Sequence, residues 1–277
     1  MLRKGGYELR DDPFLKDTPR KTLDMDGQSI EFPILYYDLR WVNAIFTART
    51  SNLKRLLPHP SFKPIEMWPG RSMLVITAIE YRDSSIGPYN EIVIAIPVKF
   101  PPGFVFPGLT ALSMMRKNVF PSYIHHLPVT IDISRRAGVH FWNHPKFLAE
   151  ITFQDRGNNL DVSFEESGMP ILKMSARKLV AKQSSGIQIH TFSIRENVVM
   201  HGLVDGWAPR FRKVMMGNVA QLELGEHRIS KELAELDLSK VARSGMYAEN
   251  MMMKMHEPDE RWDVDTLAHI QSPSSSS

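Results

Sequence analysis

Two long apolar runs separated by a short polar turn constrain the fold of this chain more than any other feature. Residues 73–81 and 91–100 are rich in Ile and Val, the β-branched residues that favour extended backbone. The polar segment between them contains Gly87-Pro88, a pair typical of turns. We therefore expect the two runs to form neighbouring strands of one sheet.

Short apolar runs divided by turn residues continue along most of the chain. Further strand candidates are residues 36–48, 127–133, 148–154, 160–164, 171–178 and 187–194. A short helix is expected at residues 52–57, where Pro58 ends it, and residues 229–255 carry the strongest helical pattern. The chain's 19 Pro and 16 Gly suit this frequent turning. The pattern predicts a mainly β (α+β) protein with a few short helices.

The chain divides by composition into a body and two ends. Residues 1–30 are polar and are expected to form an N-terminal arm, and residues 258–277 end in a serine-rich run typical of a flexible tail. Residues 31–257 are long enough for one domain with a sizeable core, and 43% of the whole chain is apolar. We expect a single domain there.

Composition excludes several function classes. The chain has no Cys, which rules out disulfides, thiolate metal sites and cysteine nucleophiles. Its formal net charge is +3 with dispersed basic residues, so no nucleic-acid partner is expected. Residues 1–7 lack the apolar core of a signal peptide, and no run approaches the roughly 18 apolar residues that span a bilayer. We predict a cytoplasmic protein with no membrane partner.

Histidines and methionines offer weaker signals. His140 and His144 stand four residues apart, but Pro145 disfavours helix at His144, so we do not predict a metal site there. The adjacent His125 and His126 are interpreted as surface or pocket residues. The methionines of residues 251–255 are interpreted as core or subunit contacts.

One lysine stands in unusual surroundings. Lys146 follows a proline and lies among Phe141, Trp142 and Phe147. Burial of an amine disfavours its charged form, and a pKa lowered by about three from about 10.4 would raise the nucleophilic fraction at neutral pH close to a thousandfold. The residues alone leave two interpretations open: an activated amine, or a lysine at a strand end that extends to water.

The segments around this lysine resemble the acetoacetate decarboxylase family. Gly138 leading into His144-Pro145-Lys146 is similar to the family's catalytic stretch. Tyr89-Asn90-Glu91, followed by Ala-Ile-Pro-Val-Lys-Phe at 95–100, looks like its Tyr-x-Glu and Ala-Ile-Pro-Val-x-Phe. The leucine-rich 52–58 segment and, in outline, residues 224–249 are similar too. The resemblance covers about residues 35–255.

This resemblance implies an antiparallel β-barrel or cone, a homo-oligomer, and no metal or organic cofactor. It implies that Lys146 forms a Schiff base with a keto acid and that Glu91 lies near it as a second catalytic residue. Arg40 is expected near the substrate carboxylate. The other residues expected to contact substrate are Ile76, Tyr89, Phe141, Trp142, His144 and Phe147.

Two positions depart from the family's pattern. Phe147 stands where the family has a second lysine, so activation of Lys146 is expected to rest on apolar neighbours or on distant charges. Ile76 stands where the family has a glutamate, unless Glu80 replaces it through a shifted register. Either change is consistent with a different substrate, a different Schiff-base reaction or lost activity, and Ile76 in place of a carboxylate suggests a substrate larger or more apolar than acetoacetate.

We therefore predict cofactor-free decarboxylation of a β-keto acid. Two alternatives remain open at this point. One is another Schiff-base reaction on a keto acid, such as aldol condensation, dehydration or cyclisation. The other is a barrel that binds a small molecule without catalysis.

Overall fold

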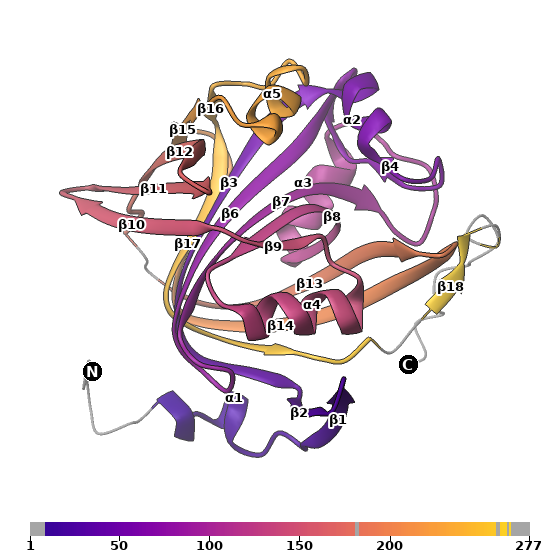
Figure 1. Cartoon of the computed structure of the whole chain (residues 1–277). Helices are drawn as coiled ribbons and strands as arrows, with labels where there is room; N and C mark the ends of the chain where they lie inside the picture. Colours follow the sequence, from indigo (N-terminus) through magenta and orange to yellow (C-terminus); the bar gives the residue numbers. More distant parts are fainter. Residues whose placement is uncertain (1–8, 181–182, 259–260, 265, 267–277) are drawn as a thin grey trace.

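A closed barrel of seven strands forms the centre of the protein, as the computed structural model shows for residues 9–180, 183–258, 261–264 and 266 (Figure 1). Its strands are β3 (Ile34–Arg49), β6 (Arg71–Ser84), β7 (Tyr89–Lys99), β8 (Val119–Val129), β13 (Gln183–Arg195), β14 (Val198–Val214) and β17 (Ser244–Met255). They follow the order β7-β6-β3-β17-β14-β13-β8, and a β7–β8 pairing closes the ring. The barrel confirms the predicted fold, although β13 pairs with β8 in parallel.

The two runs that dominate the sequence pair as predicted. β6 and β7 are antiparallel neighbours, with Thr77 opposite Val93 in the register. The polar segment between them makes a turn in which Gly87 has a φ of 96°, a conformation that L side chains rarely adopt. This turn and the strong strand pattern together fix the register of the strands that later carry the site.

A second sheet covers part of the outer wall of the barrel. It comprises β10 (Glu150–Arg156), β11 (Asn159–Glu166), β12 (Met169–Arg177), β15 (Ala220–Leu224) and β16 (Val241–Ala242), in that order. The largest apolar core lies between this sheet and the barrel, and includes Phe46 and Ile94 from the barrel and Val162 and Met174 from the sheet. Four short strands complete the pairing: β4 (Lys63–Pro64), β5 (Glu66–Trp68), β9 (Lys146–Leu148) and β18 (Arg261–Asp263).

The helices that the structure describes are short. They are α1 (Pro13–Lys16), α2 (Thr50–Leu56), α3 (Leu109–Lys117), α4 (Asp132–Trp142) and α5 (Arg228–Ala234), with a 3-10 turn at Leu9–Asp11. α2 confirms the helix predicted before Pro58. The strand predicted at residues 127–133 ends at Val129, and α4 begins at Asp132.

The helix predicted across residues 229–255 was wrong beyond α5. The second part of that range, Ser244–Met255, is β17, a strand of the barrel. Its two faces are both covered, since Met251 and Met253 pack in one core cluster while Met252 packs with Leu15 and Leu35 in another. A strand buried on both faces lacks polar alternation, so its pattern does not distinguish it from a buried helix.

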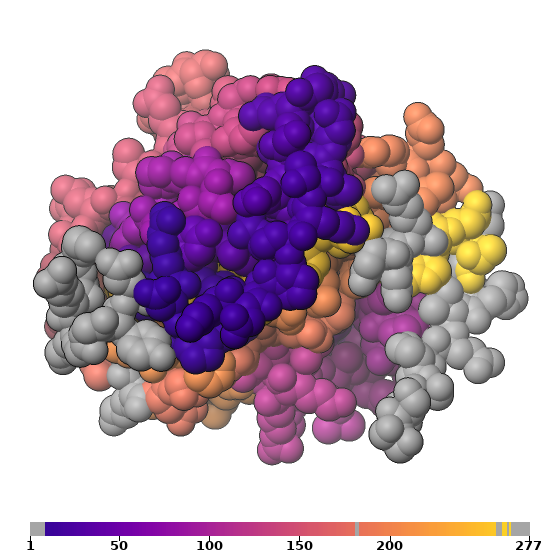
Figure 2. All heavy atoms as spheres, turned by 90° about the horizontal axis from the view of Figure 1, so that it is seen from below, coloured from indigo at the N-terminus to yellow at the C-terminus, as the bar shows by residue number. Residues whose placement is uncertain are grey.

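Part of the segment predicted as a polar arm folds against the body. β1 (Lys21–Met25) and β2 (Gln28–Phe32) form a hairpin, and their turn places Asp26 and Gly27 at positive φ, as two-residue hairpin turns require. Met25, Ile30 and Phe32 are buried. The indigo N-terminal segment covers much of the face seen in Figure 2.

The predicted tail lies largely outside the described residues, apart from β18 and its immediate neighbours. Among the helices that the structure describes, none is both long enough and apolar enough to cross a membrane.

Candidate functional site

The interior of the barrel holds a cavity of about 100 Å³. Successive side chains of a strand point to opposite faces, so alternate residues of each barrel strand reach this space. Trp41, Asn43 and Ile45 of β3 line it, as do Val75 and Thr77 of β6. The intervening residues face the outer core. The cavity wall is predominantly apolar.

Lys146 lies at the wall of this cavity and is almost fully buried. Its Nζ donates to Glu91 Oε2 at 2.8 Å and to Ser134 Oγ at 2.9 Å. The exposed fraction of the side chain is 6% for Lys146 and 8% for Glu91. Among the described lining residues, these two are the only side chains of the Lys, Arg, Asp and Glu types. They therefore form an isolated acid–amine pair in an apolar chamber.

The end of α4 determines the position of Lys146. Asn143 adopts the left-handed conformation, with φ of 52°, and its N–H bonds back to the carbonyls of Gly138 and Val139, which ends the helix. The chain then passes through Pro145 into β9, which pairs in parallel with β8. The lysine stem crosses the helix at Gly138, where an added Cβ would lie 2.4 Å from Lys146 Cδ. Only glycine leaves this path open.

Three tyrosines enclose the acid of the pair. The Tyr81 hydroxyl donates to Glu91 Oε1 at 3.2 Å, and the Tyr36 and Tyr89 hydroxyls are 3.2 Å apart. The Tyr81 ring lies 4.4 Å from each of the other two rings, measured between centroids. Burial, reinforced by the nearby Glu91 carboxylate, raises the pKa of Tyr36 and Tyr81 well above the ordinary value. Tyr81 is thus a neutral hydrogen-bond donor to Glu91 at working pH.

His144 presents a neutral imidazole to the same cavity. Burial, followed in importance by the charge of Lys146, lowers the pKa of His144 to about 3. Its ring stacks on Trp142, with an interplanar angle of 13°, and its Nε2 lies 3.2 Å from Thr191 Oγ1. Because Thr191 donates to a backbone carbonyl, Nε2 is assigned as the proton donor. Nδ1 is then a buried acceptor without a partner among the described residues.

Asn43 and Thr77 add a second polar feature to the wall. Asn43 Nδ2 donates to Thr77 Oγ1 at 2.8 Å, while the buried Asn43 Oδ1 has no hydrogen-bond partner among the described residues. Whichever way the amide is oriented, one of its polar atoms remains unsatisfied. An unpaired polar atom in an apolar chamber can bind a ligand group at low desolvation cost.

The structure brings together part of the predicted site. Lys146, Glu91 and His144 all line the cavity. Tyr89 does not line the cavity; its ring lies 4.4 Å from the Tyr81 ring and its hydroxyl lies 3.2 Å from that of Tyr36. Phe141 and Trp142 pack in the core cluster beneath the cavity rather than on its wall.

Three predicted contacts face away from the cavity. Arg40 lies on the outer face of β3 and pairs with Glu80 at 3.0 Å and with Asp155 at 3.1 Å. Ile76 and Phe147 belong to the outer core. Since adjacent residues of a strand face opposite sides, a register error of one position accounts for Arg40 and Ile76. Glu80, considered as a replacement acid, is also on the outside.

Sequence reasoning missed Ser134, Tyr36, Tyr81 and Asn43 as members of the site. Ser134 lies on a helix that was not predicted. The other three lie on predicted strands. Alternation groups Asn43 with Trp41 on β3 and Tyr81 with Thr77 on β6, but Tyr36 reaches the same face only because the register of β3 shifts near Asp38, which alternation alone does not predict.

Comparisons with known proteins give one sequence-profile match and several matches to solved structures. The sequence profile described as Acetoacetate decarboxylase (ADC) matches residues 17–261. A structure titled as structural studies of acetoacetate decarboxylase is 14% identical, covers 83% of this chain and 88% of its own, and has a TM-score of 0.57. The acetoacetate decarboxylase of Legionella pneumophila is 12% identical in sequence. The match covers 93% of this chain and 97% of that protein, with a TM-score of 0.58.

The enduracididine biosynthesis enzyme MppR, solved in complex with pyruvate, is also similar in fold. It is 11% identical over 82% of this chain and 89% of its own, with a TM-score of 0.50. No curated protein matches this chain in sequence.

Proposed function

The chain belongs to the acetoacetate decarboxylase family, and on that premise we propose that it decarboxylates a β-keto acid through a Schiff base on Lys146. The observation that supports this most is the buried Lys146 amine, which faces the cavity and lies 2.8 Å from a carboxylate. Lysine amines form Schiff bases with carbonyl substrates when an adjacent group or a desolvated site activates them.

Glu91 is placed to handle the protons of imine formation. It accepts a proton from Lys146, and the free amine then attacks the ketone carbon of the substrate. Glu91 returns that proton to the carbinolamine hydroxyl, which leaves as water and gives a protonated imine. The Tyr81 hydroxyl donates to the other oxygen of Glu91 and so orients the carboxylate toward the lysine.

The apolar wall favours loss of carbon dioxide at the next step. The imine cation withdraws the electron pair of the bond to the carboxylate, which leaves as carbon dioxide and produces an enamine. No other Lys or Arg among the described lining residues can hold that carboxylate. An unpaired carboxylate in an apolar cavity is destabilised relative to a transition state in which its charge disperses. Protonation of the enamine and hydrolysis then release the ketone.

The preferred substrate is proposed to be larger or more apolar than acetoacetate. This inference no longer rests on Ile76, which lies outside the cavity. It rests on the interior neighbours Val75, Val93, Ala95 and Ile124, which present hydrocarbon to the ligand. A β-keto acid with an extended alkyl chain would bury that chain against them.

A reaction that retains the carboxylate is the second candidate. It is supported by the unpaired amide atom of Asn43 beside the Thr77 hydroxyl, a pair that could hold an oxygen-rich group. The fold relative MppR, solved in complex with the condensation product of pyruvate and imidazole 4-carboxaldehyde, is consistent with such chemistry on this scaffold.

Borohydride trapping with β-keto acids of increasing chain length tests these proposals. We expect a reduced adduct on Lys146 by peptide mass spectrometry, with carbon dioxide released in the unreduced reaction. Lys146→Met should abolish the adduct, while Lys213→Met, which removes another partly buried amine, should retain it. An adduct without carbon dioxide would favour the carboxylate-retaining reaction. Absence of any adduct on folded protein would refute the Schiff base.

A further inference from the structure

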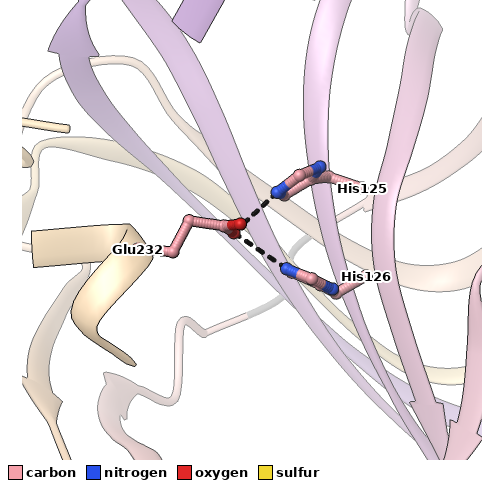
Figure 3. Close-up of side chains that lie close together, drawn as sticks. All are labelled: His125, His126 and Glu232. Atoms are coloured by element: carbon pink, nitrogen blue, oxygen red, sulfur yellow. Dashed lines mark hydrogen bonds and ion pairs between the residues drawn. The ribbon is translucent and has the colours of Figure 1, made fainter. Parts of the chain in front are cut away.

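Two histidines and a glutamate converge outside the cavity. His125 Nε2 and His126 Nε2 lie 2.7 Å and 2.9 Å from the same oxygen, Oε1 of Glu232. One ligand atom from each residue lies within 4.8 Å of the others. Figure 3 shows the two imidazoles, on β8, pointing toward the carboxylate, on α5. The glutamate lies 107 and 106 residues after the two adjacent histidines.

A local irregularity of β8 brings the two histidines together. Adjacent residues of a regular strand point to opposite faces, so both rings would not normally reach one carboxylate. Opposite the consecutive residues Ile94 and Ala95 of β7, the register of β8 moves from His126 to Ile124, which leaves His125 as an extra residue. Such a bulge re-aims side chains and is common beside functional sites.

Glu232 is positioned by contacts that do not involve the histidines. In α5, Leu233 is buried in the outer core, and the Ser230 hydroxyl donates to the backbone carbonyl of Ile171 on β12. The helix is therefore anchored to the second sheet, and Glu232 extends from it to β8. The side chains of the histidines are 12% and 15% exposed and that of the glutamate 35%, so the cluster is sheltered but accessible.

We propose that His125, His126 and Glu232 bind a zinc ion. Two imidazole nitrogens and one carboxylate oxygen are ligands that zinc takes at about 2.0–2.2 Å, with a fourth position left for water. Binding requires each Nε2 to give up its proton, either to Nδ1 of the same ring or to solvent. The ion then replaces the two hydrogen bonds that now compete for one oxygen.

This zinc site is separate from the Lys146 cavity, but its two histidines lie on β8, a strand that also contributes to the cavity wall. None of its three ligands lines the cavity, whereas Ile124 and Leu127, which flank the histidine pair on β8, do. Leu127 is also the register partner of Lys146 in β9. A zinc ion would tie the strand that supports the lysine to α5 and the second sheet.

The test is zinc binding by the full-length, untagged protein, measured by dialysis and elemental analysis. We expect one zinc per chain in the wild type and in Lys146→Met, and loss to background in His125→Ala, His126→Ala and Glu232→Gln. The matched control is His256→Gln, because His256 contacts a single carboxylate, Asp205, at 2.9 Å. That variant should keep its zinc.

A thermal measurement provides the second readout. Zinc should raise the melting temperature of the wild type and of Lys146→Met, since a ligand of the folded state stabilises it, and should leave that of Glu232→Gln unchanged. Wild-type protein that binds no zinc, or folded Glu232→Gln that binds it as well as the wild type, would overturn the proposal. Retention of zinc by Lys146→Met keeps this outcome independent of the proposed catalysis.

Discussion

Replacing Gly138 by alanine should reduce activity far more than stability. The new Cβ would lie 2.4 Å from Lys146 Cδ and 2.5 Å from its Cε, roughly 1 Å short of ordinary carbon contact. The stem of Lys146 is the flexible partner in this clash, so we expect it to move. Its amine would then leave the positions 2.8 Å from Glu91 and 2.9 Å from Ser134.

The structure allows both effects to be estimated. A misplacement of about 1 Å at a reacting group can lower the rate about 100-fold. For stability, alanine gains about 1 kcal/mol over glycine inside a helix, while overpacking costs about 1–3 kcal/mol. The free energy of unfolding should therefore fall by at most about 2 kcal/mol.

Steady-state kcat/KM with the best β-keto acid, the rate of borohydride trapping and the melting temperature together provide the assay. The control is Val139→Ala, an exposed neighbour in the same helix, which should behave like the wild type. A folded Gly138→Ala protein with wild-type trapping and turnover would refute the reasoning that this glycine fixes the path of Lys146.

Three further predictions concern the cavity wall. Glu91→Gln should lower kcat by about 100- to 10,000-fold while retaining substrate binding, because it removes the proton acceptor; unchanged kcat would contradict that role. Asn43→Leu should raise KM about tenfold for substrates with a hydroxyl beyond the keto group and little for alkyl ones, as expected for one lost hydrogen bond; equal effects on both would argue against contact with Asn43. Because the pKa of His144 is lowered to about 3 in the folded protein, the unfolded state binds the extra proton below about pH 6.5, so stability should fall by about 2 kcal/mol between pH 7 and pH 5 from this group. Urea unfolding of His144→Asn at both pH values should show a correspondingly smaller loss, and an identical loss would exclude His144 as the cause.

Patterns local in sequence predicted much of the fold. The β6–β7 pair, the meander of the second sheet and the helix before Pro58 all follow from apolar runs and turn residues whose partners are near in the chain. The resemblance around Gly138 and Lys146 likewise led to an amine that the structure places beside Glu91, which was the predicted neighbour.

Features that depend on the facing of side chains and on distant contacts were not predictable in the same way. Moving one residue along β3, from Arg40 to Trp41, changes the side chain from the outer surface to the cavity, and the resemblance did not fix the register that finely. The cluster at His125 could not be predicted because Glu232 lies on a helix 107 residues later in the chain. The bulge in β8 that turns both histidines toward Glu232 also leaves no signal in the hydrophobic pattern.

Alternation along the barrel strands also has an evolutionary consequence. Ile76, Ile92 and Ile94 hold the outer core, while the intervening Val75 and Val93 contact the ligand space. A mutation at an inward position can therefore enlarge or reshape the chamber without removing a side chain from the largest core. Substrate range can therefore diverge among homologues at inward positions such as Val75 and Val93 while the largest core, held by Ile76, Ile92 and Ile94, is kept.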